Sequence, residues 1–203
     1  MAANRREIAK AETKQLILKT ARSMFLEKGV DKCTLRDIAK VAGVSPASIV
    51  VHFKNKTSLL EVALNQEITS TVEKAIKSLP ENKDLLSKLL HTSQHMFKFY
   101  DKNRALYRAL LKHTLLEPEE NNPHITEELD NYIRFITCLI EEEDQKGALL
   151  AGTDLNIASS SVAGLYIGVL IMFFRDTSMT PEAASVMLEK MTSTFLTGIL
   201  KRR

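Results

Sequence analysis

The stretch that decides the fold is TLRDIAKVAGVSPASIVVHFKNK, residues 34–56. Thr34 and Asp37 match a capping box that begins a helix, and Gly43 offers the positive φ that ends one. Ser45 and the proline after it then match the cap and first position of a second helix. Two helices joined by so short a turn predict a helix-turn-helix unit. In DNA-binding proteins of this type the second helix enters the major groove.

Helical periodicity continues on both sides of this unit, and no long stretch alternates as a strand would. Composition agrees: the chain is rich in Ala, Leu, Lys and Glu, with no Trp and 44% hydrophobic residues. We therefore predict an all-α fold of about nine helices. An N-terminal three-helix helix-turn-helix domain would span residues 1–55 and a connecting helix 56–80, followed by a larger helical domain, 81–203. Residues 1–9 are interpreted as a flexible basic arm. The remaining helices are expected at 9–28, 83–100, 103–116, 122–146, 154–176 and 180–200.

Charge is unevenly placed along the chain. Residues 1–60 hold 12 Lys+Arg against 5 Asp+Glu, a net charge of +7, whereas residues 61–203 have a net charge of −4. This asymmetry indicates a local site for a polyanion such as DNA, although a basic solubilising surface would read the same way. The two isolated cysteines, Cys33 and Cys138, match neither a zinc site nor a disulfide framework. With no apolar signal segment at the N-terminus, we expect a cytoplasmic protein.

Residues 16–60 resemble the DNA-binding domain of the TetR/AcrR family of bacterial transcriptional regulators. The matching positions are Ala21, Phe25, Gly29-Val30, Thr34-Leu35-Arg36-Asp37-Ile38-Ala39, Ala42-Gly43-Val44-Ser45, His52-Phe53, Lys56 and Leu59-Leu60. Residues 81–203 contain no matching motif, but their helix count is compatible with the family's divergent half, which binds effectors and forms dimers. The resemblance therefore implies a homodimer that binds a double-stranded operator and responds to a small molecule.

The candidate DNA-binding residues lie at the helix starts and on the second helix of the unit. Arg36 is the best candidate for reading a base, because Arg pairs bidentately with guanine; an ion-paired surface Arg is the alternative. Val50 stands where the family usually has a phosphate-binding Tyr, and valine cannot donate a hydrogen bond. Base edges are therefore left to Arg36, apolar contacts and DNA shape. The full predicted set is Thr34, Arg36, Ser45, Pro46, Ala47, Ser48, Val50, Val51, His52, Lys54 and Lys56.

Two further sets belong to the larger half. Apolar and aromatic positions with a few polar groups predict an effector pocket, although many of them are also expected in the core: Phe97, Tyr100, Tyr107, Leu111, Tyr132, Phe135, Ile136, Leu139, Tyr166, Leu170 and Phe173. The resemblance implies that the last two helices form the dimer interface, with packing inside one chain as the alternative. Its predicted residues are Ser160, Gly164, Gly168, Met187, Met191 and Phe195.

Other patterns receive the plainer interpretation. His91 and His95 have a spacing that suits two zinc ligands, but no third ligand is evident and ordinary histidines are favoured. The uncharged run 157–174 is long enough to cross a membrane, yet three serines dilute it, and a helix between a core and a partner subunit reads the same way. No catalytic motif occurs, so we predict no enzyme activity, no cofactor and no metal.

The sequence therefore predicts a sequence-specific transcriptional regulator, a repressor released from its operator by a small, largely apolar ligand. One alternative is a DNA-binding protein of the same fold without a small-molecule effector, controlled by a protein partner or acting in chromosome organisation. A helical enzyme or a membrane-associated protein is a further alternative from a different class.

Overall fold

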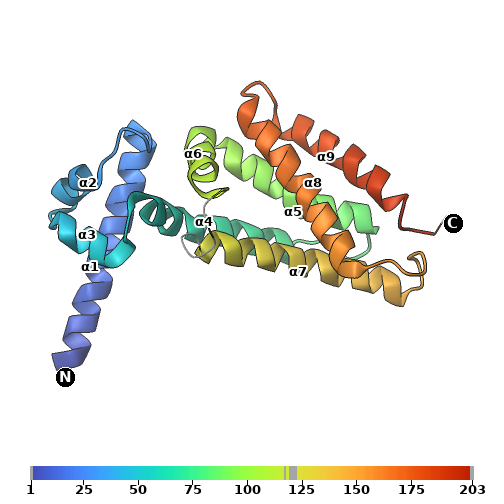
Figure 1. Cartoon of the computed structure of the whole chain (residues 1–203), viewed down its shortest axis with the longest axis horizontal. Coiled ribbons are helices and arrows are strands. Elements are labelled where there is room, and N and C mark those ends of the chain that lie inside the picture. The colour runs from blue at the N-terminus through green and yellow to red at the C-terminus, as the bar shows by residue number, and fades with distance from the viewer. Residues whose placement is uncertain (1, 117, 119–122, 202–203) are drawn as a thin grey trace. The chain divides into compact units, whose positions relative to one another are not determined.

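The structure is a computed structural model in which residues 2–116, 118 and 123–201 are described. Those residues form nine helices and no strand, apart from an isolated bridge between Leu149 and Leu200, so the predicted all-α fold is confirmed (Figure 1). The helices are α1 (Ala2–Lys28), α2 (Leu35–Ala42), α3 (Pro46–Phe53), α4 (Lys56–Lys77), α5 (Leu85–Asp101), α6 (Arg104–Thr114), α7 (Pro123–Gln145), α8 (Leu155–Arg175) and α9 (Pro181–Leu196).

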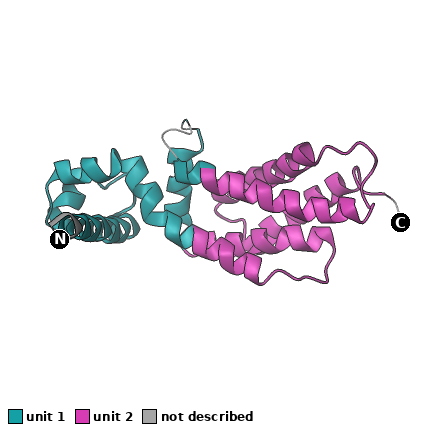
Figure 2. Ribbon diagram, turned by 90° about the horizontal axis from the view of Figure 1, so that it is seen from below, with its two compact units in different colours: residues 1–68, 103–126 teal, residues 69–102, 127–203 magenta. Residues whose placement is uncertain are grey.

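The chain divides into two compact units (Figure 2). Unit 1 comprises residues 1–68 and 103–126, and unit 2 comprises residues 69–102 and 127–203. Helices α4 and α7 each contribute residues to both units. This division follows packing, whereas the predicted boundaries at 55 and 80 follow function, and those boundaries stay a prediction.

Helices α1, α2 and α3 form the three-helix head of unit 1, and α2 and α3 pack on one apolar face of α1. Ile17, Ala21 and Phe25 lie at helical spacing and are at most 1% exposed. Ile38 of α2 and Ile49 of α3 are fully buried as well. Burial of a side chain of this size stabilises the fold by about 1.5–3 kcal/mol, so these contacts fix where α2 and α3 lie on α1.

The predicted flexible arm at residues 1–9 is wrong. Helix α1 already begins at Ala2 and continues without a break to Lys28. The physical reason lies in the residues themselves: alanine, arginine, glutamate and lysine are good helix formers, and the first strong helix breaker along the chain is Gly29. High charge in this segment is compatible with a solvated helix, and residues 5–12 are exposed.

Unit 2 is a bundle in which α9 packs against α5 and α8. Helix α8 is long and apolar enough to cross a membrane, but half of its apolar window is buried inside the chain, as in the core helix of a globular protein. Its inward side joins a cluster with α5, α7 and α9. That cluster comprises Leu85, Leu89, Ile136, Leu139, Ile140, Leu149, Ala158, Val162, Ala163 and Leu196.

Candidate nucleic-acid interface and effector region

The start of α2 is fixed by the predicted capping box. The Asp37 backbone N–H donates to Thr34 Oγ1 at 3.1 Å, and the Asp37 carboxylate accepts from both the Thr34 backbone and its hydroxyl. These hydrogen bonds hold the pKa of Asp37 below its usual range. Thr34 therefore has a structural role before any phosphate arrives. Arg36, two residues after Thr34, is exposed.

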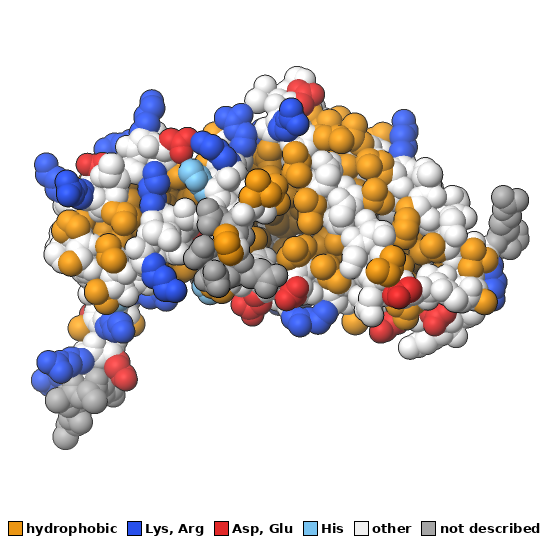
Figure 3. All heavy atoms as spheres, viewed as in Figure 1, with side chains coloured by type: hydrophobic (Ala, Val, Ile, Leu, Met, Phe, Trp, Pro, Cys, Tyr) orange, Lys and Arg blue, Asp and Glu red, His pale blue; other side chains and the backbone are white. Residues whose placement is uncertain are grey.

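Helix α3 presents an apolar outer side. Ser45 caps it by accepting a hydrogen bond from the Ser48 backbone N–H at 3.1 Å, while Ile49 and Phe53 point into the core. The outer side is lined by Pro46, Ala47, Val50 and Val51, all of them exposed. Figure 3 shows hydrophobic side chains on the surface over α3, close to lysine and arginine side chains.

The C-terminal end of the unit holds the predicted phosphate-binding residues. The Lys56 ammonium donates to two backbone carbonyls, those of Val30 at 3.1 Å and Cys33 at 3.2 Å, and so holds the loop that leads into α2. Lys54 is exposed and ends α3 with a positive φ of 60°. His52 is half-buried, and burial lowers its pKa, with nearby lysine charge as the second cause.

Sequence reasoning missed two members of this surface. The positive charges of Lys10 and Lys14 on α1 both lower the pKa of His52, after the larger effect of burial. Lys14 Nζ lies 6.0 Å from the centre of the Phe53 ring. The two lysines are four residues apart and therefore share a face of α1. That spacing was visible in the sequence, and the helix expected at 9–28 already contained both lysines. What the sequence did not give is that this face of α1 lies beside His52 of α3.

Carboxylates connect the other helices of unit 1. Glu67 of α4 forms an ion pair with Arg22 of α1 at 2.5 Å and accepts a hydrogen bond from the Tyr107 hydroxyl of α6 at 3.1 Å. Glu61, also on α4, is 1% exposed and accepts the backbone N–H of Ile125 at 2.9 Å, in the first turn of α7. Tyr107, predicted to line a pocket, therefore ties α6 to α4.

A further tie joins α6 to the loop between α1 and α2. Asp31 in that loop accepts hydrogen bonds from Lys112 at 3.2 Å and from His113 at 3.1 Å. Leu111, the remaining predicted pocket residue of α6, precedes these two residues and is half-buried. Both predicted pocket residues of α6 thus belong to unit 1.

Five predicted pocket residues meet in one aromatic cluster in unit 2. The Phe97 ring lies 5.7 Å from Tyr166 and 5.4 Å from Phe173, and Tyr132 lies 5.2 Å from Tyr166. Tyr100 joins through a hydrogen bond to Tyr166 and through the ring of Phe174, 5.6 Å away, which the sequence reasoning had not selected.

The three tyrosines of this cluster are half-buried, with their hydroxyls surrounded by protein atoms. Burial raises the pKa of Tyr132 to about 12, and it raises the pKa values of Tyr100 and Tyr166 as well. Tyr132 has a hydrogen-bond partner in Ser93 Oγ, 3.4 Å away. The hydroxyls are therefore neutral at all physiological pH values and act as hydrogen-bonding groups only.

The other predicted pocket residues of unit 2 serve its core. Ile136 and Leu139 belong to the hydrophobic cluster, Phe135 packs against it and Leu170 is buried. A place in the core, the alternative expected for many of the pocket residues, is therefore what the structure gives for these four side chains.

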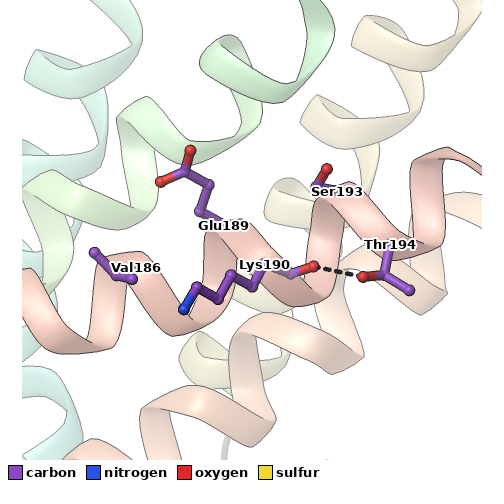
Figure 4. A pocket seen from close by; sticks show the side chains of 5 residues that line it. All are labelled: Val186, Glu189, Lys190, Ser193 and Thr194. Atoms are coloured by element: carbon purple, nitrogen blue, oxygen red, sulfur yellow. Dashed lines mark hydrogen bonds between the residues drawn. The ribbon is translucent and has the colours of Figure 1, made fainter.

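The predicted dimer residues lie along α8 and α9. Ser160 and Gly164 are exposed, whereas Gly168, Met187, Met191 and Phe195 are half-buried. A Cβ placed at Gly164 or Gly168 would meet nothing within 4 Å, so packing inside the chain does not require glycine there. Figure 4 shows an open depression along α9. It is lined by Val186, Glu189, Lys190, Ser193 and Thr194.

His91 and His95 have ordinary hydrogen bonds. His91 Nε2 lies 2.9 Å from Ser78 Oγ, and His95 Nδ1 lies 2.9 Å from the backbone carbonyl of His91. Their rings are 4.5 Å apart. Among the described residues no group of three His, Cys, Asp or Glu side chains is placed to hold a metal ion.

Residues 17–63 match the family model described as bacterial regulatory proteins, tetR family. The match covers α2, α3, most of the part of α1 that supports them and the first residues of α4, the region that contains the capping box and the buried face described above. Residues 17–63 are therefore a DNA-binding region of the tetR type, as the sequence motifs predicted.

Particular relatives extend beyond that region. The uncharacterized HTH-type transcriptional regulator YvkB of Bacillus subtilis (strain 168) is 28% identical over 190 residues, 92% of this chain and 97% of its own length. The nucleoid occlusion factor SlmA of Vibrio cholerae is 24% identical over 173 residues, 85% of each chain. Among solved structures, Thermus thermophilus FadR, a TetR-family repressor in complex with lauroyl-CoA, superposes with a TM-score of 0.74 at 20% identity. That superposition covers 94% of this chain and 96% of the other, and it shows a shared fold.

Proposed function

We propose that this regulator is a dimeric repressor, acting in the cytoplasm, that leaves its operator when a small, largely apolar molecule binds in unit 2. The observation that supports this most is the aromatic cluster around Tyr100, Tyr132 and Tyr166. Small-molecule sites are mainly apolar with a few well-placed polar groups, and three buried hydroxyls among phenylalanine rings have that composition. The similarity in fold to a repressor that binds lauroyl-CoA supports the same ligand class.

Release from DNA needs a route by which ligand in unit 2 biases the head in unit 1. Helix α4 is suited to this role because it has hydrogen bonds in both units. In unit 2 the hydroxyl of Thr69 donates to Glu128 of α7, and in unit 1 Glu61 and Glu67 contact α7, α1 and α6. A ligand that prefers one arrangement of α4 and α7 would shift the population of heads that fit the operator.

The dimer would form through α8 and α9. Their outer sides expose Ile157 (65%), Met172 (45%) and Val186 (49%), apolar area that a second copy would cover. Packing within the chain does not require glycine at position 164 or 168. Small residues at these positions would allow the helices of two subunits to approach closely. Two copies would then read the two halves of a pseudo-palindromic operator.

The direct experiment selects DNA sequences with the purified full chain and then measures binding in the presence of candidate ligands. We expect specific binding to an inverted repeat, released by apolar molecules of moderate size. Tyr132→Phe, which removes one hydroxyl but keeps the ring, should weaken the ligand response and leave operator binding unchanged. Binding no tighter than to random DNA at physiological salt would contradict the regulator role, and release by no ligand would contradict the effector role alone.

Arg36 is proposed to read a base, since it is exposed immediately after the α2 cap. Arg36→Ala should weaken specific binding by about 1–3 kcal/mol and relax the preference at one operator position. Its neighbour Lys40, also exposed on α2, offers the control: Lys40→Ala should weaken all sequences alike. An Arg36→Ala variant with an unchanged preference at every position would exclude base reading by Arg36.

The similarity to SlmA supports one second candidate, a DNA-binding protein of this fold that acts in chromosome organisation. The selected DNA distinguishes the two functions. Sites concentrated upstream of a few genes favour the repressor, whereas sites spread over much of the chromosome favour the alternative.

A further inference from the structure

The outer side of α3 is an apolar strip in a basic unit. Pro46 with Val50 and Ala47 with Val51 are pairs at i, i+4, so the four side chains form two adjacent rows on one face. Val51 is 76% exposed and Val50 is 48% exposed. Single exposed valines are common, but four neighbouring apolar residues on an eight-residue helix are a surface that a partner of matching chemistry can cover.

These valines are not explained by the stability of the head. Ile49 and Phe53 already supply the buried side of α3. Val50 and Val51 add nothing comparable to the core, and β-branched residues lose side-chain entropy in a helix. Alanine or lysine at either exposed position would favour the helix more. Their presence is instead consistent with a function that needs an apolar outer surface.

Charge around the strip points to the occupant. Residues 46–53 contain no acidic side chain, and basic side chains occur on the neighbouring elements: Arg36 on α2, Lys54 after α3, and Lys10 and Lys14 near His52. An apolar strip flanked by basic side chains matches the DNA major groove, where phosphates flank the bases. The apolar group that the bases present in that groove is the C5-methyl of thymine.

We propose that Val50 and Val51 read thymine methyl groups, and that this contact sets much of the sequence preference of the protein. The proposal rests on the DNA-binding function given above and names the chemistry by which the site discriminates. Each valine would cover a methyl that cytosine lacks and that no other base places in the same position. Operator half-sites should accordingly have thymines, on either strand, at the positions beneath the second turn of α3.

The test uses the operator obtained by selection with the full chain. Each thymine of one half-site is replaced in turn by deoxyuridine, which removes the methyl and keeps base pairing, and affinity is measured by fluorescence anisotropy. Because a buried methyl is worth about 0.8 kcal/mol, we expect a loss of about four-fold at one or two thymines and no change at the others. Thymidine is deoxyuridine with a methyl group at C5, so the unmodified operator serves as the reference for each replacement.

Variants then identify the residues responsible. In Val51→Ala and Val50→Ala the loss on methyl removal should shrink toward none at the sensitive thymine, because the methyl no longer has a contact to lose. Val41→Ala is the matched control, as Val41 is an equally exposed valine (62%) on α2 rather than α3, and it should keep the full four-fold effect. Circular dichroism of each variant verifies that the helices remain.

The outcomes separate the two claims. If no sequence is selected at all, the DNA-binding function fails and the methyl proposal with it. If an operator is found but deoxyuridine binds as well as thymidine everywhere, the function stands and the proposal is overturned. A methyl effect that persists in the Val50→Ala and Val51→Ala double variant also overturns it, because another residue would then read the methyl.

Discussion

The contacts inside unit 1 differ in chemistry from the contacts inside unit 2. In unit 1, carboxylates connect elements that are far apart in the sequence. Asp31, Glu61 and Glu67 each contact partners that are at least 40 residues away along the chain. In unit 2, aromatic rings and aliphatic side chains make up the central cluster, and the carboxylates of Glu128 and Glu142 add one contact each, to Thr69 and Lys88. Hydrogen bonds and ion pairs depend strictly on distance and angle and are lost when their partners move apart, whereas apolar contacts tolerate small shifts. A reading head needs the first property, and a site for a largely apolar ligand needs the second.

Removing a ring from unit 2 should have the largest effect on stability. Phe173 is fully buried, with its ring 5.4 Å from Phe97 and 5.5 Å from Phe174. Phe173→Ala should lower the free energy of unfolding by about 3–5 kcal/mol, measured by urea denaturation. Met172→Ala, at the neighbouring position that is 45% exposed, should cost far less. Equal losses for the two variants would mean that the aromatic cluster is not a packed core.

A carboxylate in unit 1 should come next. Glu61 is 1% exposed, and its acceptance of the Ile125 N–H places a negative charge at the N-terminus of α7, where the helix dipole favours one. Glu61→Ala would leave that N–H without its partner and should cost about 1–3 kcal/mol.

Glu61→Gln separates charge from hydrogen bonding, because the amide oxygen can still accept. It should recover part of the loss, and hydrogen exchange in the first turn of α7 should be slower than in Glu61→Ala. Glu73→Ala, an exposed position on the same helix, is the control and should be nearly neutral. A neutral Glu61→Ala would remove the proposed link between α4 and α7.

The same contrast explains what the sequence could predict. The head was predictable because its signals are local: Thr34 and Asp37 are three residues apart, and so are Ser45 and Ser48. The fold class and helix bounds likewise follow from periodicity and breakers such as Gly43. The carboxylate ties and the aromatic cluster were not predictable, because Glu67 and Tyr107, or Phe97 and Phe173, meet only through the packing of whole helices.

The prediction of a flexible arm at residues 1–9 also failed. Its charge favoured a mobile segment, and the helix propensity of each residue favoured a helix. The absence of any breaker before Gly29 decides the matter in favour of α1. Lys10 and Lys14, which lie near His52 of α3, belong to the part of α1 that the sequence had already predicted to be helical.

Lys56 offers a test that divides structural from DNA-binding roles within the head. Two of its three ammonium hydrogens bond to the carbonyls of Val30 and Cys33, and the third remains for a phosphate. Lys56→Met should lower stability by about 1 kcal/mol and also reduce the slope of log affinity against log salt by about one. Lys54→Met, at an exposed lysine, should change only the slope. Unchanged stability in Lys56→Met would show that the carbonyl contacts hold nothing in place.

The smallest effect, and the one that best isolates a polar tie, should come from Asp31. Hydrogen bonds from His113 and then Lys112 hold its pKa below the ordinary value of 3.8. A lowered pKa in the folded state means that the ionised carboxylate stabilises unit 1 above pH 3.8, and that this contribution is lost as pH falls through the lower folded value. Asp31→Asn should therefore lower the urea midpoint slightly at pH 5 and leave it unchanged at the most acidic pH that the fold tolerates. Asp130→Asn, at an exposed carboxylate of α7, should lack this pH dependence. Because Asp31 is a surface residue, salt should weaken the effect, whereas a difference that survives at high salt and low pH would point to a packing role instead of a charge.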